Sequence, residues 1–138
     1  RSRMKGFLQA FNARGIDFDC RKIFDSTGYM EIAEKYTLQM LKDGIECIIC
    51  MDDNICLNVL NALRKYKVWI PSDIKVASFY NSQVLEEYYP PISCVNLDIT
   101  KLSKQASHVL YSILSEEKCP HRTKQGYEVL MKESTKML

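Results

Sequence analysis

The sequence has few of the residues that catalytic and nucleotide-binding motifs require. Five glycines and two histidines occur among 138 residues. Neither a Gly-rich phosphate loop nor a Gly-x-Ser-x-Gly nucleophile motif can be found. We therefore expect no enzymatic activity and no cofactor. No apolar run approaches the roughly 18 residues that a membrane span needs, so we expect no membrane association.

The chain also lacks a clear excess of charge of either sign. Nineteen basic residues against seventeen acidic ones leave a formal net charge of +2. Lys and Arg form no run with interleaved aromatic residues. Binding of nucleic acid by this chain itself is therefore not expected. Residues 1–6 lack the apolar core of a secretion signal, which favours a soluble chain.

The cysteines indicate a reducing compartment. Cys47, Cys50 and Cys94 lie in predicted core strands, and Cys56 lies on the apolar side of a predicted helix. These are usual places for reduced, structural thiols, so we expect a cytoplasmic protein.

The middle of the chain predicts an open parallel α/β sheet flanked by helices. Ile45–Met51 and Ile74–Phe79 are short, mostly apolar runs, which we interpret as strands buried on two faces. The segment between them has apolar residues at helical spacing, so one helix returns the chain to a neighbouring parallel strand. These apolar residues are Cys56, Val59, Leu60 and Leu63.

Further elements continue this alternation. A parallel sheet does not ordinarily begin with an uncovered helix, so we expect a strand to precede the first helix. The predicted elements are a helix over Arg3–Ala13 ended by Gly15, a strand over Ile16–Cys20, a helix over Gly28–Lys42 capped by Ser26, a short helix or loop over Asn81–Tyr89, a strand over Ile92–Leu97, a helix over Thr100–Ser115 and a final strand over Tyr127–Met131.

Two short patterns resemble metal or redox motifs. Cys47-Ile-Ile-Cys50 has the spacing of a thiol pair, but residues three apart in a strand point to opposite faces. Cys119-Pro-His121 has no second ligand pair, so we expect no zinc site. A small flavodoxin-like enzyme or redox protein that uses Cys50 or Asp52 remains as an alternative.

Five motifs, in order along nearly the whole chain, resemble the effector-binding core of the lactose-repressor and galactose-repressor (LacI/GalR) family of bacterial transcription regulators. The family pattern is Arg-x-x-Gly-aromatic, Asn-Asp before a helix, Val-Pro-x-Asp-Ile-x-Val, x-Pro-Pro-Leu-Thr and Arg-x-Ser/Thr-Thr. The similar segments here are Arg3–Phe7, Asp52-Asp53, Ile70–Val76, Tyr89–Ser93 and Lys132–Thr135.

The resemblance implies a periplasmic-binding-protein-like fold in which two lobes hold a small-molecule effector between them. Residues 1–95 would form the carboxyl-terminal lobe, and residues 96–138 would supply a crossover helix and a final strand that pack with the amino-terminal lobe. DNA would be bound only through a helix-turn-helix that these 138 residues do not contain. A periplasmic-type solute-binding protein shares this fold and is a second alternative.

The resemblance also implies ligand-binding residues at the carboxyl ends of the strands. These are Arg3, Phe24 (or Ile23 after a one-residue shift), Asp52 and Tyr80. Each has a structural alternative: a solvated chain end for Arg3, a core aromatic for Phe24 and a helix cap for Asp52, although we expect Asp53 to be the better cap. Tyr80 stands where the family has Asp, so we expect a nucleobase-like effector or an altered sugar.

A homodimer is implied by the same resemblance, with Leu57, Leu60 and Tyr88 at its interface. The alternative is an intramolecular core, above all for Leu60. The helix near Leu102 and Ile113 has a broad apolar side, which we expect to be covered by repacking, by swapping or by another chain.

Overall fold

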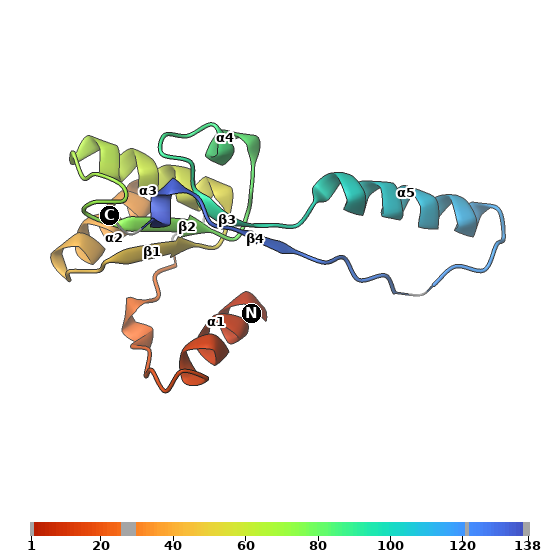
Figure 1. Ribbon diagram of the computed structural model, residues 1–138, viewed down its shortest axis with the longest axis horizontal. Coiled ribbons are helices and arrows are strands. Elements are labelled where there is room, and N and C mark those ends of the chain that lie inside the picture. Colours follow the sequence, from red (N-terminus) through yellow and green to blue (C-terminus); the bar gives the residue numbers. More distant parts are fainter. Residues whose placement is uncertain (1, 26–29, 121, 137–138) are drawn as a thin grey trace.

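The structure, a computed structural model, describes residues 2–25, 30–120 and 122–136. In these ranges four strands form one sheet in the order β1-β2-β3-β4 (Figure 1). Strands β1 (Cys47–Cys50), β2 (Lys75–Ser78) and β3 (Ser93–Asn96) are parallel, whereas β4 (Glu128–Leu130) is antiparallel to β3. The predicted open, mostly parallel sheet is confirmed.

Helix α3 (Asp53–Lys65) links β1 to β2 and contributes four of the ten residues of the buried cluster, more than any other element. Its apolar side is buried against the sheet and against α2 (Met30–Lys42), as its helical spacing predicts. Burying each such aliphatic side chain contributes about 1.5–3 kcal/mol. The buried cluster consists of Ile48, Cys50, Cys56, Val59, Leu60, Leu63, Ile74, Val76, Leu85 and Ile92, of which Leu85 comes from the short helix α4 (Gln83–Glu86).

The prediction that β1 is buried on two faces is wrong. Ile48 and Cys50 are buried, whereas Cys47 is exposed and Ile49 is 40% exposed. The reason is that β1 is the edge of the sheet and α3 covers only one of its faces. Cys47 is therefore not a core thiol.

Helix α1 (Ser2–Asn12) stands apart from the sheet beyond β1 and buries none of its residues completely (Figure 1). Gly15 ends this segment with φ +68°, the left-handed conformation that favours glycine. Phe7, Phe11 and Phe18 form an aromatic cluster with ring centroids 4.8–5.0 Å apart. A hollow of about 320 Å³ lies between these rings and β1.

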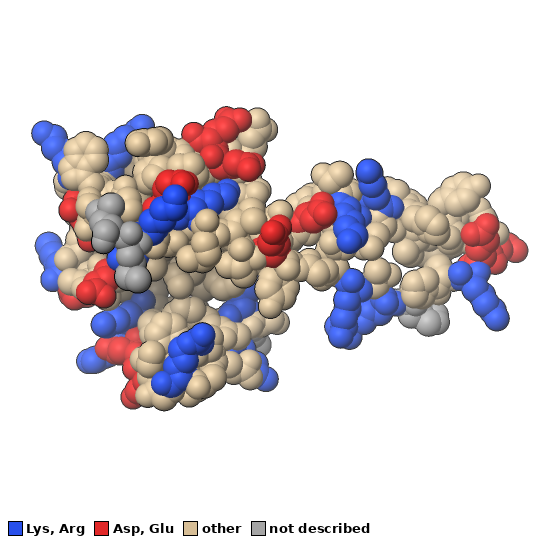
Figure 2. All heavy atoms as spheres, viewed as in Figure 1, with Lys and Arg blue, Asp and Glu red and all other residues tan. Residues whose placement is uncertain are grey.

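The carboxyl-terminal helix α5 (Ile99–Leu114) projects away from the sheet, and Figure 2 shows it as an arm beside the main body. Its apolar side is largely uncovered, since Leu102, Leu110 and Ile113 are 44–58% exposed. No helix in the described ranges has both the length and the apolarity to cross a bilayer.

The last segment of the described chain packs on the sheet. Strand β4 pairs with β3, and the 3-10 helix η2 (Glu133–Thr135) packs against β2. The hydroxyl of the buried Ser134 donates to the carbonyl of Val76 at 2.7 Å and accepts from the backbone N–H of Ser93 at 2.8 Å. These residues therefore pack on the sheet next to β2 and β3.

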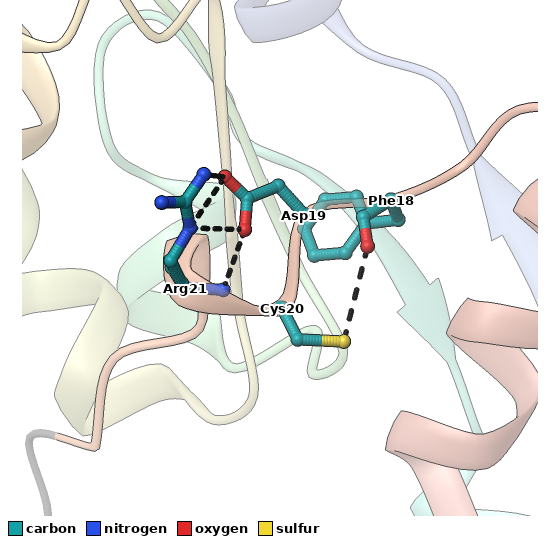
Figure 3. Close-up of polar contacts among 4 residues, drawn as sticks. All are labelled: Phe18, Asp19, Cys20 and Arg21. Carbon is teal, nitrogen blue, oxygen red and sulfur yellow. Dashed lines mark hydrogen bonds and ion pairs between the residues drawn. The ribbon is translucent and has the colours of Figure 1, made fainter.

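The predicted strand over Ile16–Cys20 is wrong. Residues Cys20–Lys22 form the 3-10 helix η1 instead, and Figure 3 shows how Asp19 caps it. The Asp19 carboxylate accepts from the backbone N–H of Arg21 at 3.0 Å and from its guanidinium at 2.9 Å. No described strand lies beside this segment to pair with it. The hydrogen bonds of the Asp19 side chain to the local backbone therefore stabilise a turn in place of a strand. The expected cap Ser26 lies outside the described residues.

Candidate functional site

Asp52 and Tyr80 lie at the same edge of the sheet. The parallel register pairs Cys50 of β1 with Ser78 of β2. Asp52 and Tyr80 each follow their paired residue by two positions, so both leave the sheet at the carboxyl ends of neighbouring strands. Open α/β sheets bind ligands just outside this edge. We call the edge formed by Met51, Asp52 and Tyr80 the strand-end rim.

Asp52 begins α3 as its N-cap. Its backbone is extended (φ −153°, ψ 173°), and its carboxylate accepts from the backbone N–H of Ile55 at 2.8 Å. The expectation that Asp53 is the cap is wrong, because Asp53 bonds only the N–H of its neighbour Asn54. Asp52 is half-buried, and the cap uses one of its two oxygens. The carboxylate therefore keeps acceptor capacity for a ligand.

Arg3 reaches the rim from α1. Its Nη1 donates to the carbonyl of Met51 at 2.6 Å, and its Nη2 lies 3.5 Å from the hydroxyl of Tyr80. The guanidinium also lies over the Tyr80 ring, 5.1 Å from the centroid. Within the described ranges no carboxylate lies within ion-pair distance of Arg3. The structure thus brings Arg3, Tyr80 and the end of β1 together, and the charge of Arg3 stays open to solvent.

Phe24 lies beside β1 and α2. Its ring packs against Tyr36 of α2 with centroids 5.0 Å apart and the ring planes tilted by 41°. It also lines hollows next to β1 together with Met51. Among the described residues no polar or ring contact joins Phe24 to Arg3 or Tyr80. Phe24 thus packs beside β1, as its structural alternative describes, and its contact with a ligand stays a prediction.

Asn81 and Lys132 extend the rim network and were not among the predicted site residues. The Asn81 side-chain oxygen accepts from Nζ of Lys132 at 2.8 Å and from the thiol of Cys94 at 3.0 Å. Lys132 opens the closing sequence motif, but nothing in its local sequence shows that it reaches the residue after Tyr80. The sheet pairing of β3 with β4 creates this contact.

The predicted dimer residues have different surroundings. Leu57 and Tyr88 are half-buried at the border of the core, whereas Leu60 has no exposed surface. Leu60 is therefore a core residue and presents no surface to a second chain. Burial raises the pKa of Tyr88 above its ordinary value, and the nearby charge of Arg64 lowers it in part.

The Cys50 thiol lacks the environment of a reactive nucleophile. All six cysteines are free. The neighbouring Cys56 thiol and burial raise the pKa of Cys50 well above its ordinary value, which disfavours the thiolate. No cluster of three metal-ligating residues occurs in the part of the chain that the structure describes. His121 of the Cys119-Pro-His121 pattern lies outside it.

Comparison with known proteins gives a consistent match. The family model of the periplasmic binding protein-like domain matches residues 1–135. The transcriptional regulator GalR of Streptococcus thermophilus is 27% identical over 120 residues, which cover 83% of this chain and 36% of that protein. The transcriptional repressor PurR of Photobacterium profundum is 25% identical over 141 residues, which cover 100% of this chain and 42% of that protein.

Solved structures show the same fold. The transcription regulator CcpA of Lactococcus lactis superposes with a TM-score of 0.85 at 24% identity, over 97% of this chain and 50% of that one. A LacI-type transcription regulator of Bifidobacterium animalis superposes with a TM-score of 0.86 at 21% identity, over 98% of this chain and 50% of that one. The chain thus spans about half the length of these solved chains. It spans less than half the length of the GalR and PurR proteins.

Proposed function

The chain belongs to the family of periplasmic binding protein-like domains, and from this premise we propose that it is the effector-binding module of a bacterial LacI-type transcription regulator. The relatives named above are transcription regulators, which favours this function over solute transport on the same fold. The module is non-catalytic. A cytoplasmic location follows from the proposed role.

One observation carries the proposal: the Arg3 guanidinium joins α1 to the ends of β1 and β2 at the strand-end rim. A planar guanidinium presents five N–H donors in a fork, and the contacts to Met51 and Tyr80 leave several of them free. Asp52 adds an acceptor at the same rim. A polar small molecule bound at the strand-end rim could therefore accept hydrogen bonds from Arg3 and donate one to Asp52.

The rim supplies one side of the ligand's contacts, and a second lobe would supply the others. An effector held between two lobes stabilises their closed arrangement and so shifts the population of conformations. In a regulator this shift would change the spacing of DNA-binding heads. DNA contact itself would come from a helix-turn-helix outside these 138 residues.

The rim chemistry favours a nucleobase-like effector or an altered sugar. Tyr80 supplies a ring face and a hydroxyl where the motif resemblance implies a carboxylate for sugar hydroxyls. The ring is half-buried and already pairs with a planar group, the Arg3 guanidinium. A flat heterocycle can occupy the same kind of position.

Dimerisation with a second copy belongs to the proposal as well. Leu57 and Tyr88 lie on the outer side of α3 and after α4, where they keep exposed surface. Leu60 takes no part because it is buried.

Calorimetry of the 138-residue chain tests the proposal. We expect weak or undetectable binding of sugars and of purine bases, because only half of the contacts are present. Arg3→Gln should abolish any heat that is measured, whereas Arg14→Gln at the other end of the α1 segment should leave it unchanged. A sugar that binds with low-micromolar affinity, or binding that Arg3→Gln leaves intact, would contradict the proposed site.

A further inference from the structure

The hollow between α1 and β1 adjoins the strand-end rim. It measures about 320 Å³, and sites for small molecules usually measure about 300–1,000 Å³. Met51 belongs both to the rim and to the lining of this hollow, which we call the α1 hollow. The lining includes Met4, Phe7, Phe18, Phe24, Ile49 and Met51.

The walls of the α1 hollow are apolar but open to water. Ile49 of β1 is 40% exposed, and Ile23 is 38% exposed. The side chains of Met4 and Phe7, which α1 contributes, are only half-buried. Covering apolar surface that is in contact with water lowers the free energy in proportion to the area covered. An apolar group of a ligand would therefore be stabilised in this place.

Contacts at both ends of α1 hold the α1 hollow in shape. At the amino end, Nη1 of Arg3 donates to the carbonyl of Met51 at 2.6 Å. At the carboxyl end, the backbone N–H of Ile16 donates to the carbonyl of Phe11 at 3.1 Å and turns the chain. Phe18 then packs edge-on against Phe11, with ring centroids 5.0 Å apart. Because the chain itself forms these walls, a ligand would lose little free energy in ordering them.

The side chains of the lining offer few hydrogen-bond partners. Lys22 is the only charged residue among them, and Cys47 adds a thiol. A nucleobase in the α1 hollow would lose the water around its ring nitrogens and exocyclic groups and would regain few hydrogen bonds, which is costly. A hydrocarbon ring has no such groups. The α1 hollow therefore fits a phenyl-sized apolar group better than a nucleobase.

Polar contacts for the rest of such a ligand lie next to the α1 hollow. Arg3 has free N–H donors at the strand-end rim, and Asp52 has a free acceptor there. Met4 follows Arg3 in α1, and Met51 precedes Asp52, so each polar residue has an immediate neighbour in the lining of the hollow. A ligand with hydroxyl groups at one end and an apolar ring at the other can use both places.

We infer that the effector carries a phenyl-sized apolar group that packs in the α1 hollow, while its hydroxyl-bearing part binds at the strand-end rim. The inference rests on the proposed function and specifies the altered sugar as a glycoside with an apolar substituent. The ring packs between Phe18 and Phe7 on one side and Ile49 on the other. Since α1 forms one wall, the bound ligand also ties α1 to the sheet.

Two matched ligands test the inference, phenyl β-D-glucopyranoside and methyl β-D-glucopyranoside. Each is titrated at millimolar concentration into the isotope-labelled 138-residue chain, and nuclear magnetic resonance follows the backbone amides and the methyl groups of Met4 and Ile49. Both ligands should shift the amides of the rim. We expect the phenyl ligand to bind at least about tenfold more tightly, because its ring is removed from water. Only the phenyl ligand should shift the two methyl groups.

A variant that fills the α1 hollow separates the two parts of the ligand. Ile49→Trp places a larger ring in the hollow, and since Ile49 lies on the exposed side of β1, the buried side of the strand stays unchanged. The ratio of the two affinities should fall from about tenfold to about one. Val129→Trp is the matched control, because Val129 is 57% exposed on β4, away from the hollow, and the ratio should stay at its original value.

Three results would overturn the inference and leave the proposed function distinguishable from it. Equal affinities of the two ligands at the rim, or a phenyl preference that Ile49→Trp leaves intact, would remove the apolar group from the α1 hollow while the effector site stands. Shifts at Met4 and Ile49 without shifts at the rim would assign the hollow to an apolar ligand unconnected with the effector. The absence of shifts with both ligands would contradict the inference and the proposed function together.

Discussion

The Arg3 guanidinium lies over the ring of Tyr80, with its central carbon 5.1 Å from the ring centroid, although the two residues are 77 positions apart. Helix α1 buries no residue completely, so this contact and the bond from Arg3 to Met51 tie its amino end to the sheet. The residues that we propose to bind the effector therefore also hold α1 in place.

Replacement of Tyr80 tests this double role. Tyr80→Leu removes the stacking face, which is worth about 0.5–1 kcal/mol at an exposed site. We expect the backbone amides of α1 to exchange about two to five times faster, as followed by hydrogen exchange. Tyr80→Phe keeps the ring and loses only a 3.5 Å hydroxyl contact, so it should resemble the original chain. Equal exchange in Tyr80→Leu would show that α1 is held elsewhere.

Asp52→Ala removes the cap of α3. The free energy of unfolding should fall by about 1 kcal/mol, because the backbone N–H of Ile55 loses its acceptor at the start of the helix. Urea unfolding measures the difference. Asp53→Ala is the matched control and should cost clearly less, since Asp53 bonds only its neighbour. A larger loss for Asp53→Ala would reverse the assignment of the cap.

Ser134→Ala breaks two buried hydrogen bonds between the last segment and the sheet. The backbone N–H of Ser93 would lose its acceptor and the carbonyl of Val76 its donor, so we expect a loss of about 1–3 kcal/mol in unfolding free energy. Ser107→Ala removes a comparable hydroxyl contact on the exposed side of α5 and should change stability by less than about 0.5 kcal/mol. Similar values for both variants would show that η2 does not support the lobe.

Acid should weaken the link between α2 and α3 at Glu34. Hydrogen bonds from Lys65 and, to a smaller extent, from Tyr66 hold the pKa of Glu34 below its ordinary value. A lowered folded-state pKa gives stability that is present above the unfolded value and is lost as the pH falls through the folded one. Glu34→Gln should therefore lower the melting temperature slightly at pH 7 and leave it unchanged in strong acid. A deficit that persists in acid would mean that packing, and not charge, is lost.

Thiol reactivity distinguishes the sensor from the redox alternative. Cys50, Cys56 and Cys94 are buried, and the pKa of Cys50 is raised, so these thiols should react with an aromatic disulfide reagent only after unfolding. Cys20 and Cys47 are exposed and should react in the folded chain. One fast thiol of low pKa at Cys50 would favour the enzyme.

The sequence predicts the parts of this fold that depend on the spacing of residues close together in the chain. The apolar spacing of α3 and the strands around it leads to the observed parallel register, and that register places Asp52 and Tyr80 at one edge. Gly15 marks the end of the first helical segment, and its positive φ confirms the reason. These predictions depend only on local periodicity and on the rule for strand ends.

The remaining elements depend on contacts that no local pattern shows. Ile16–Cys20 alternates like a strand but has no neighbour, so the turn capped by Asp19 forms instead. The contact of Lys132 with Asn81 joins residues 51 positions apart and exists because β4 returns to β3. The choice between Asp52 and Asp53 as the cap depends on one residue of register at the helix start, which spacing alone does not resolve.

The most direct test of the effector site is a nuclear magnetic resonance titration of the isotope-labelled chain with purine bases and simple sugars at millimolar concentration. The proposed site predicts that amide shifts gather at Met51, Asp52 and Tyr80 and at the start of α1, and that Arg3→Gln removes them. Shifts that gather along α5 or at the amino ends of the strands and leave the strand-end rim unchanged would contradict it.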